Sequence, residues 1–165
     1  DYLVDRYGYE RVAFADKVRE VAQAFDFSIF VDGIGEISMS DIYSDESLAG
    51  LRKSDEVRAN LVFVAQTLRE TIGQNIWAEP VIQQVRRRPY QRFVVTDVRQ
   101  ENEANLLRHN FDTTMIGIRR PGIIGAEPVE ASTIPGIACD YTIDNNGSQE
   151  KLHKAIDALM IKGCY

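Results

Sequence analysis

Short apolar runs that alternate with helical segments constrain the fold of this chain most strongly. Phe93, Val94 and Val95 form a compact apolar strand, which is followed by a helical pattern over 101–109 and a further strand over 114–118. Parallel strands need a long crossover connection, and a helix usually provides it. The order strand, helix, strand therefore predicts an α/β fold in which helices flank a parallel sheet.

The same alternation extends toward both ends of the chain. Residues 11–14 have the character of a short buried strand, and residues 16–25 have that of an amphipathic helix. Apolar spacing and glycine stops predict further helices over 55–72, 76–85 and 152–160, with a last strand over 141–143. We assign all of these elements to a single domain that covers residues 1–165.

Two segments lack this patterning. Residues 28–54 combine weak periodicity with three glycines and several acidic residues, which predicts an irregular insertion. Residues 119–135 begin with Arg119-Arg120-Pro121-Gly122 and are rich in helix and strand breakers, which predicts a loop-like stretch.

The charge balance restricts the partners of the chain. The sequence holds 19 Lys and Arg against 25 Asp and Glu, a net charge of −6, which disfavours sequence-independent binding to nucleic acid or anionic lipid. No apolar run approaches the length of a membrane span, and Cys139 and Cys164 are too few for a disulfide framework. We expect a cytoplasmic protein with two free thiols and with no nucleic-acid or membrane partner.

The predicted strand ends carry the polar side chains that suit chemistry. Ligands of open α/β sheets bind beyond the carboxyl ends of the strands, and here those ends carry Asp16, Thr96, Asp97, Arg99 and Arg119. An acidic residue directly after an apolar strand is typical of a Mg²⁺-holding carboxylate in phosphate-transferring enzymes. The same pattern is also typical of a turn or a helix cap, so both interpretations of Asp97 stay open.

Arginine and tryptophan side chains supply further candidates. A guanidinium group is permanently charged and makes paired hydrogen bonds to phosphate, so Arg69, Arg99, Arg119 and Arg120 are candidate phosphate ligands. Each of them is alternatively a solvated surface residue. Trp77, the single tryptophan, either stacks on a base or fills the core.

Five segments, taken in order, carry a resemblance to a known family. They are Tyr9-Glu10-Arg11-Val12-Ala13-Phe14-Ala15-Asp16, the stretch from Leu68-Arg69 to Gly73 and Trp77, Val95-Thr96-Asp97-Val98-Arg99 with Asn102-Glu103-Ala104, Ile118-Arg119-Arg120-Pro121-Gly122, and Asp140 to Ile143-Asp144-Asn145-Asn146-Gly147-Ser148. Together they resemble the phage-type deoxynucleoside monophosphate kinases over nearly the whole chain. The resemblance implies a P-loop kinase-like fold in which residues 119–135 form a lid-like segment.

The activity that the resemblance implies is transfer of the γ-phosphoryl group of ATP to a deoxynucleoside monophosphate. Such enzymes use ATP with Mg²⁺ and act by positioning and charge neutralisation. A homodimer and a place in the host cytoplasm, if a phage encodes the protein, are further expectations from the resemblance.

On the acceptor side, the resemblance implies roles for five residues. Asp16 would orient the acceptor or its metal-bound water, and Asp97 would support Mg²⁺. Arg69 and Arg99 would hold the acceptor phosphate. Trp77 would help to bound the pocket for the acceptor nucleoside.

On the ATP side, the implied residues lie in the last third of the chain. Arg119 or Arg120 would neutralise charge on the transferred group when the lid closes and excludes water. Asn145, Asn146 and Gly147 would line the adenine pocket.

One departure from the family bears directly on activity. Relatives carry a first strand and a Gly-rich loop ending in Gly-Lys-Asp/Ser-Thr before a helix similar to residues 1–7, whereas no Gly-Lys dipeptide occurs here. Because that loop cradles the phosphates of ATP, we expect that residues 1–165 alone do not turn over and that the loop precedes them.

Two alternatives to this function stay open. Dephospho-coenzyme A kinases are similar in the terminal segment that runs from an Asp and a strand to Asn, Gly and Ser. A non-catalytic nucleotide-binding or partner-binding protein is the other alternative, and it applies if the loop is absent from the natural gene.

Overall fold

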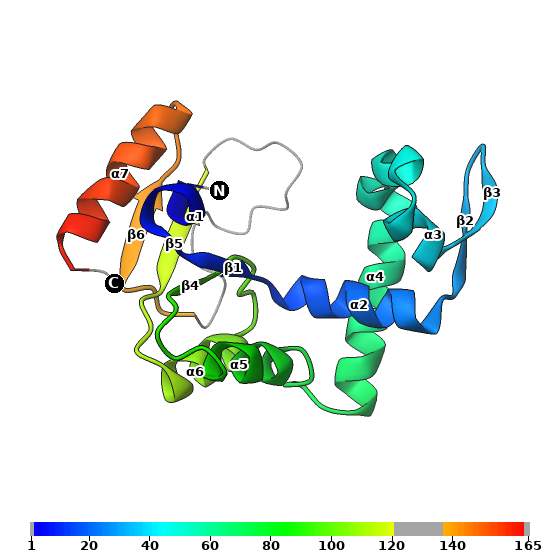
Figure 1. Cartoon of the computed structure of the whole chain (residues 1–165), viewed down its shortest axis with the longest axis horizontal. Helices are drawn as coiled ribbons and strands as arrows, with labels where there is room; N and C mark the ends of the chain where they lie inside the picture. The colour runs from blue at the N-terminus through cyan, green and yellow to red at the C-terminus, as the bar shows by residue number, and fades with distance from the viewer. Residues whose placement is uncertain (1, 121–136, 164–165) are drawn as a thin grey trace. The chain divides into compact units, whose positions relative to one another are not determined.

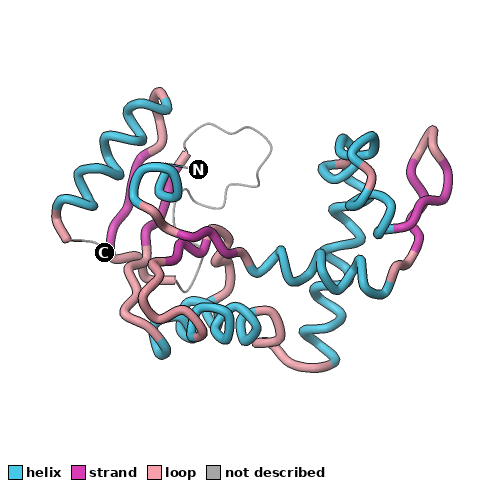
Figure 2. Tube along the Cα trace, viewed as in Figure 1, coloured by secondary structure: helices cyan, strands magenta, loops and turns pink. Residues whose placement is uncertain are grey.

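The computed structural model describes residues 2–120 and 137–163, which form a mixed α/β structure of helices and short strands (Figures 1 and 2). The contacts of the chain divide it into two compact units. Unit 1 comprises Asp1–Arg11, Arg88–Val94 and Val98–Tyr165, and unit 2 comprises Val12–Arg87 and Val95–Asp97.

Unit 1 is built around two parallel strands near the C-terminus. It contains α1 (Tyr2–Tyr7), α6 (Glu101–Asn110), β5 (Ile116–Arg119), β6 (Tyr141–Asp144) and α7 (Gln149–Ile161). β5 and β6 pair in parallel, with Ile116 opposite Tyr141 and Arg119 opposite Asp144, and α7 packs against β6 (Figure 1). The carboxyl ends of the two strands therefore lie side by side.

A cluster centred on Asp157 attaches α1 to α7. The hydroxyls of Tyr2 and Tyr7 donate hydrogen bonds of 2.6 and 2.7 Å to Oδ1 of Asp157, and Nε of Arg6 lies 3.3 Å from the same oxygen. The Tyr2 ring stacks on His153 with a centroid separation of 3.8 Å. Hydrogen bonds from Tyr2 and Tyr7, with the charge of Arg6, lower the pKa of the Asp157 carboxyl.

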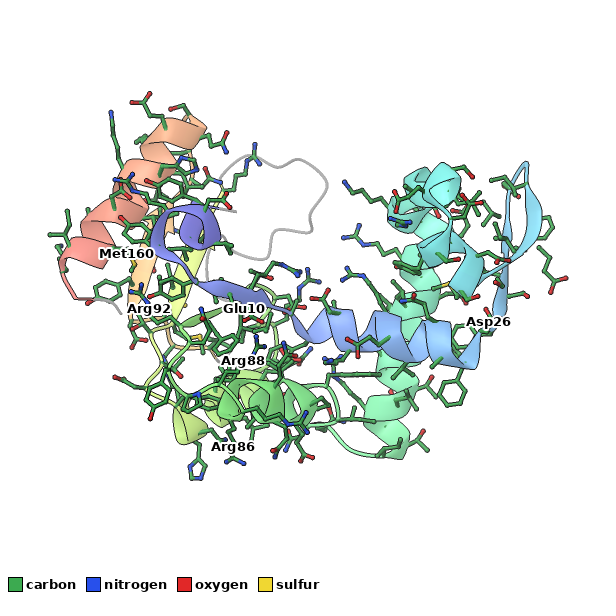
Figure 3. The ribbon with its side chains drawn as sticks, viewed as in Figure 1. Glu10, Asp26, Arg86, Arg88, Arg92 and Met160 are labelled. Atoms are coloured by element: carbon green, nitrogen blue, oxygen red, sulfur yellow. The ribbon has the colours of Figure 1, made fainter. Side chains whose placement is uncertain are left out.

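A second strand pair is formed by two strands that each contain residues of both units. β1 (Glu10–Val12) pairs with β4 (Phe93–Val95). The Glu10 amide donates to the Arg92 carbonyl at 2.8 Å, and the Thr96 amide donates to the Val12 carbonyl at 3.3 Å. Because the bonds advance in the same direction along both strands, the pair is parallel. An ion pair between Arg88 and Glu10 lies beside its start (Figure 3).

Unit 2 is mainly helical and has its own core. It contains α2 (Phe14–Phe25), an antiparallel hairpin of β2 (Ser28–Val31) and β3 (Gly35–Ser38), α3 (Met39–Ser44), the 3-10 helix η1 (Glu46–Lys53), α4 (Asp55–Thr71) and α5 (Ala78–Arg86). Its helices and hairpin enclose a cluster of side chains that are each no more than 4% exposed, namely Ala22, Ile29, Val31, Met39, Ile42 and Val57.

The prediction of an irregular insertion over 28–54 is wrong. The segment forms β2, β3, α3 and η1, and it supplies four of the six core residues above. Its elements are too short to show a period, and Phe30, which is 69% exposed, hides the inward alternation of Ile29 and Val31. Gly33 and Gly35 have φ angles of 77° and 102°, a region that favours glycine and permits the tight turn.

Most other predicted elements are confirmed to within a few residues. The helices at 55–72, 76–85, 101–109 and 152–160 correspond to α4, α5, α6 and α7, and the strands at 114–118 and 141–143 correspond to β5 and β6. Phe14, predicted as the end of a strand, instead begins α2. The mixed α/β class is therefore confirmed, whereas the described strands form three two-stranded sheets, and a P-loop kinase-like sheet stays a prediction.

Some predictions fall wholly or largely on residues that the structure does not describe. Of the lid-like segment 119–135, Arg119 and Arg120 alone lie within the described ranges, and Cys164 lies outside them. Among the helices of residues 2–120 and 137–163, none combines the length and the apolar character needed to span a membrane.

Because residues 28–54 supply core side chains, shortening one of these side chains should lower the stability of the fold. Ile42→Ala removes a fully buried side chain and should lower the free energy of unfolding by about 2–5 kcal/mol. Ser44→Ala, two residues away and exposed, is the control and should change it by less than about 0.5 kcal/mol. Urea denaturation checks both; equal effects would show that this segment is not packed.

The Asp157 carboxylate predicts a pH dependence on the acid side. Since the folded state lowers the pKa of Asp157, its contribution to stability is present above the ordinary Asp pKa of about 3.9 and is lost as pH falls through the lower folded value. The ring-proton shifts of Tyr7, followed by NMR, should move as pH falls below about pH 4. Tyr7 is the probe because the Tyr2 ring stacks on His153. Asp157→Asn should abolish this transition, and Asp112→Asn, at an exposed site, should leave it in place.

Candidate functional site

The predicted site residues fall into two groups, each inside one unit. The first group, in unit 2, comprises Asp16, Arg69, Trp77 and Asp97. The second group, in unit 1, comprises Arg99, Arg119, Arg120, Asn145, Asn146 and Gly147. We describe each group by itself.

Asp97 holds the N-terminal end of α2. Its Oδ1 accepts a hydrogen bond of 2.9 Å from the Phe14 amide, and its Oδ2 accepts one of 2.8 Å from the Ala15 amide. The first amides of a helix have no partner within the helix, and Ala13 at the N-cap position has no side chain that can accept from them. Asp97, which follows β4, therefore caps a helix that begins 83 residues earlier in the sequence.

Asp16 lies in the first turn of the same helix. Its amide donates to the Ala13 carbonyl at 3.2 Å, and Nη1 of Arg19 donates to its Oδ1 at 2.6 Å. The side chains of Asp16 and Arg19 are 37% and 39% exposed, so this pair faces solvent. The structure thus brings Asp16 and Asp97 to one helix end, and the clustering of all the strand-end residues in one site stays a prediction.

The environment of Asp97 does not fit direct coordination of Mg²⁺. Both carboxylate oxygens already accept backbone amides, and a cation at this carboxylate would lie beside the positive end of the α2 dipole. Within residues 2–120 and 137–163, no three or more His, Cys, Asp or Glu side chains form a group suited to a metal ion. Of the two interpretations that the sequence left open, the geometry favours the helix cap.

Trp77 and Arg69 lie at the α4–α5 connection. The Trp77 ring is 2% exposed, and its Nε1 donates to the Ala65 carbonyl on α4 at 3.0 Å. Its indole therefore fills the core, and its faces are not open to a base in this structure. Arg69 lies in the last turn of α4, where its side chain is half-buried and its Nε atom is buried.

The second group is organised by the parallel pairing of β5 and β6. Arg119, at the end of β5, donates from Nε and Nη2 to the two oxygens of Asp144 on β6, at 2.6 and 3.1 Å. The Asn145 amide donates to the Arg119 carbonyl at 2.6 Å. The structure therefore places Arg119 beside the start of the predicted adenine segment, although 26 positions separate them in sequence.

The rest of that segment forms the turn into α7. Nζ of Lys151 donates to Oδ1 of Asn146 at 2.9 Å, and Oγ of Ser148 caps α7 by accepting from the Lys151 amide at 3.3 Å. A Cβ atom at Gly147 would lie 2.7 Å from Cδ of Lys151, so a side chain at Gly147 would displace the lysine. The glycine thus lets Lys151 fold back over the turn.

Arg99 and Arg120 are exposed. The Arg99 and Gln100 amides donate to Oε2 of Glu103, at 2.9 and 3.1 Å, and Glu103 is 2% exposed. The Glu103 carboxylate therefore caps α6 and fixes the backbone that carries Arg99. This contact gives the Asn102-Glu103-Ala104 motif a structural explanation.

Sequence reasoning missed two side chains that the structure adds to the second group, Asp144 and Lys151. The signal for Asp144 was present, because parallel register sets the last residues of both strands opposite one another. For Lys151, the signal was its place three residues after an N-cap serine, in the first turn of a helix.

Removing the buried α6 cap should be costly. Glu103→Ala leaves two backbone amides without their acceptor and should lower the free energy of unfolding by about 1–3 kcal/mol. Glu101→Ala, two residues earlier and exposed, should cost less than about 0.5 kcal/mol. Thermal unfolding of both variants compares them; a neutral Glu103→Ala would contradict the capping role.

No protein-family model, no curated protein and no solved structure matches this chain. Family membership is therefore not shown by these comparisons, and the functional argument rests on the motifs and on the geometry of the two groups.

Proposed function

We propose that the chain belongs to an ATP-dependent deoxynucleoside monophosphate kinase. One observation carries the proposal: the parallel pairing of β5 and β6 sets Arg119 against the turn at Asn145, Asn146 and Gly147. The motifs that resemble this kinase family assign these residues to the transferred phosphate and to the adenine. A common binding region requires them to be neighbours, although they are distant in sequence.

The chemistry of this strand end suits a phosphate-bearing ligand. The Arg119 guanidinium binds the Asp144 carboxylate through two parallel hydrogen bonds, and the same fork of donors matches two oxygens of a phosphate. Lys151 adds a second cation at the adjoining turn. Both cations are held close to the strand ends, where ligands of α/β sheets bind.

The acceptor-side residues would act by orientation. Asp16 is partly exposed in the first turn of α2, where Arg19 binds one of its oxygens, and by the resemblance its carboxylate would accept a hydrogen bond from the acceptor. Arg99 is exposed at the start of α6 and would pair with the acceptor phosphate. In this proposal ATP, bound with Mg²⁺, supplies the phosphoryl group, and the residues above bind and orient the two substrates.

The choice of ATP and a deoxynucleoside monophosphate as substrates rests on the resemblance alone. The same holds for the homodimer, the cytoplasmic location and the phosphate-binding loop, whose Gly-Lys ending does not occur in residues 1–165. The nucleotide kinase proposal is therefore tested on the product of the whole gene.

The decisive assay combines that protein with ATP, Mg²⁺ and each of the four deoxynucleoside monophosphates. We expect a deoxynucleoside diphosphate from at least one of them. Phosphorylation of dephospho-coenzyme A instead would favour the first alternative. A gene product without a Gly-rich loop, silent on every acceptor, would favour a binding protein and overturn the proposal.

A variant of Arg99 separates acceptor binding from ATP binding. Arg99→Ala should raise KM for the acceptor by about tenfold or more, because a hydrogen bond to a charged group is worth about 1.5–3 kcal/mol. KM for ATP should change by less than about twofold. Arg87→Ala, an exposed arginine outside both groups, is the matched control. Unchanged acceptor kinetics would remove Arg99 from the site.

A further inference from the structure

We propose that Asp97 is a positioning residue, which fixes the first turn of α2 and thereby Asp16, and that it does not ligate Mg²⁺. The part that concerns Asp16 rests on the proposed function. The part that concerns the helix end stands on the hydrogen bonds alone.

The α2 terminus depends on an acceptor from outside the helix. The Phe14 and Ala15 amides point at the two oxygens of Asp97, at 2.9 and 2.8 Å, and Ala13 offers no side-chain acceptor. Ala13 and Phe14 are each 3% exposed, so solvent has little access to the Phe14 amide, whereas Ala15 is only partly buried. Without Asp97, the Phe14 amide would remain in a buried environment without a hydrogen-bond partner, which is costly, and the Ala15 amide would lose its acceptor.

The electrostatics favour the same role. A carboxylate at a helix N-terminus is stabilised by the helix dipole, and its hydrogen bonds to amides are charge-assisted. A divalent cation on the same carboxylate would meet that dipole at its positive end and would compete with two short amide bonds. The Asp97 carboxylate is therefore better suited to accept hydrogen bonds from the helix amides than to ligate a metal ion.

The capped turn determines where Asp16 points. Asp16 directly follows Ala15, and its own amide closes the turn by donating to the Ala13 carbonyl at 3.2 Å. Arg19, three residues farther along, holds its carboxylate at 2.6 Å. If the Phe14 and Ala15 amides lost their acceptor, the first turn would fray, and the Asp16 carboxylate would lose its fixed direction.

The hydrogen-bond part is tested without any activity, by amide exchange in the 165-residue chain. Asp97→Ala should speed exchange at Phe14 and Ala15 by about tenfold or more. Asp97→Asn keeps one acceptor oxygen, so one of the two amides should lose protection even if the alanine variant fails to fold. Asp41→Asn, an exposed carboxylate in the first turn of α3, is the control. Unchanged exchange at both amides would overturn the proposal.

The metal part is tested by titrating the same chain with MgCl₂ while amide shifts of residues 95–98 are recorded. We expect no saturable change that depends on Asp97. A saturable shift that Asp97→Asn abolishes would show a metal ligand and would overturn the proposal.

The Asp16 part is tested on the active enzyme by a double-variant comparison. Asp97→Asn should lower kcat while KM for ATP and the Mg²⁺ concentration for half-maximal rate stay within about twofold. If Asp97 acts through Asp16, the double variant Asp16→Asn with Asp97→Asn should be no slower than Asp16→Asn alone. If the losses in kcat of the two single variants multiply in the double variant, the two residues act independently, and this part is overturned. If no phosphoryl transfer is found, the exchange and titration results still decide the role of Asp97 at the helix end.

Discussion

The pair of hydrogen bonds from the α2 amides to Asp97 is the interaction on which the N-terminal end of α2 depends. A helix that begins with Ala13-Phe14-Ala15 has no side chain that can cap it, and the burial of Ala13 and Phe14 limits the access of water to its first amide. The carboxylate that follows β4 fills this need and ties two segments 83 residues apart. One side chain thereby joins a strand end, a helix start and the first turn that carries Asp16.

A comparable contact joins the ends of β5 and β6. Arg119 and Asp144 stand opposite one another in the β5–β6 register, and their paired hydrogen bonds hold a guanidinium group at the edge of the sheet. A bound phosphate would have to compete with Asp144 for this group. The turn that follows β6 is tied to the same strand end, because the Asn145 amide donates to the Arg119 carbonyl and Lys151 donates to Asn146.

The sequence predicted the long elements well and the short ones poorly, for physical reasons. α4 and α7 show a full apolar period, whereas the hairpin at Ser28–Ser38 is too short and exposes Phe30. Strand-end reasoning singled out Asp16 and Asp97, which lie at the same end of α2, but it could not distinguish a metal ligand from a cap. That distinction depends on which donors face the carboxylate, and the Phe14 and Ala15 amides are far away in sequence.

The central claim, that the residues at the β5–β6 strand ends bind the phosphate donor of a nucleotide kinase, is tested most directly by mapping ATP by NMR on the isotope-labelled product of the whole gene. The account predicts that ATP shifts the amides of Arg119 and Asn145–Gly147. Absence of ATP binding, or shifts confined to other residues, would contradict it.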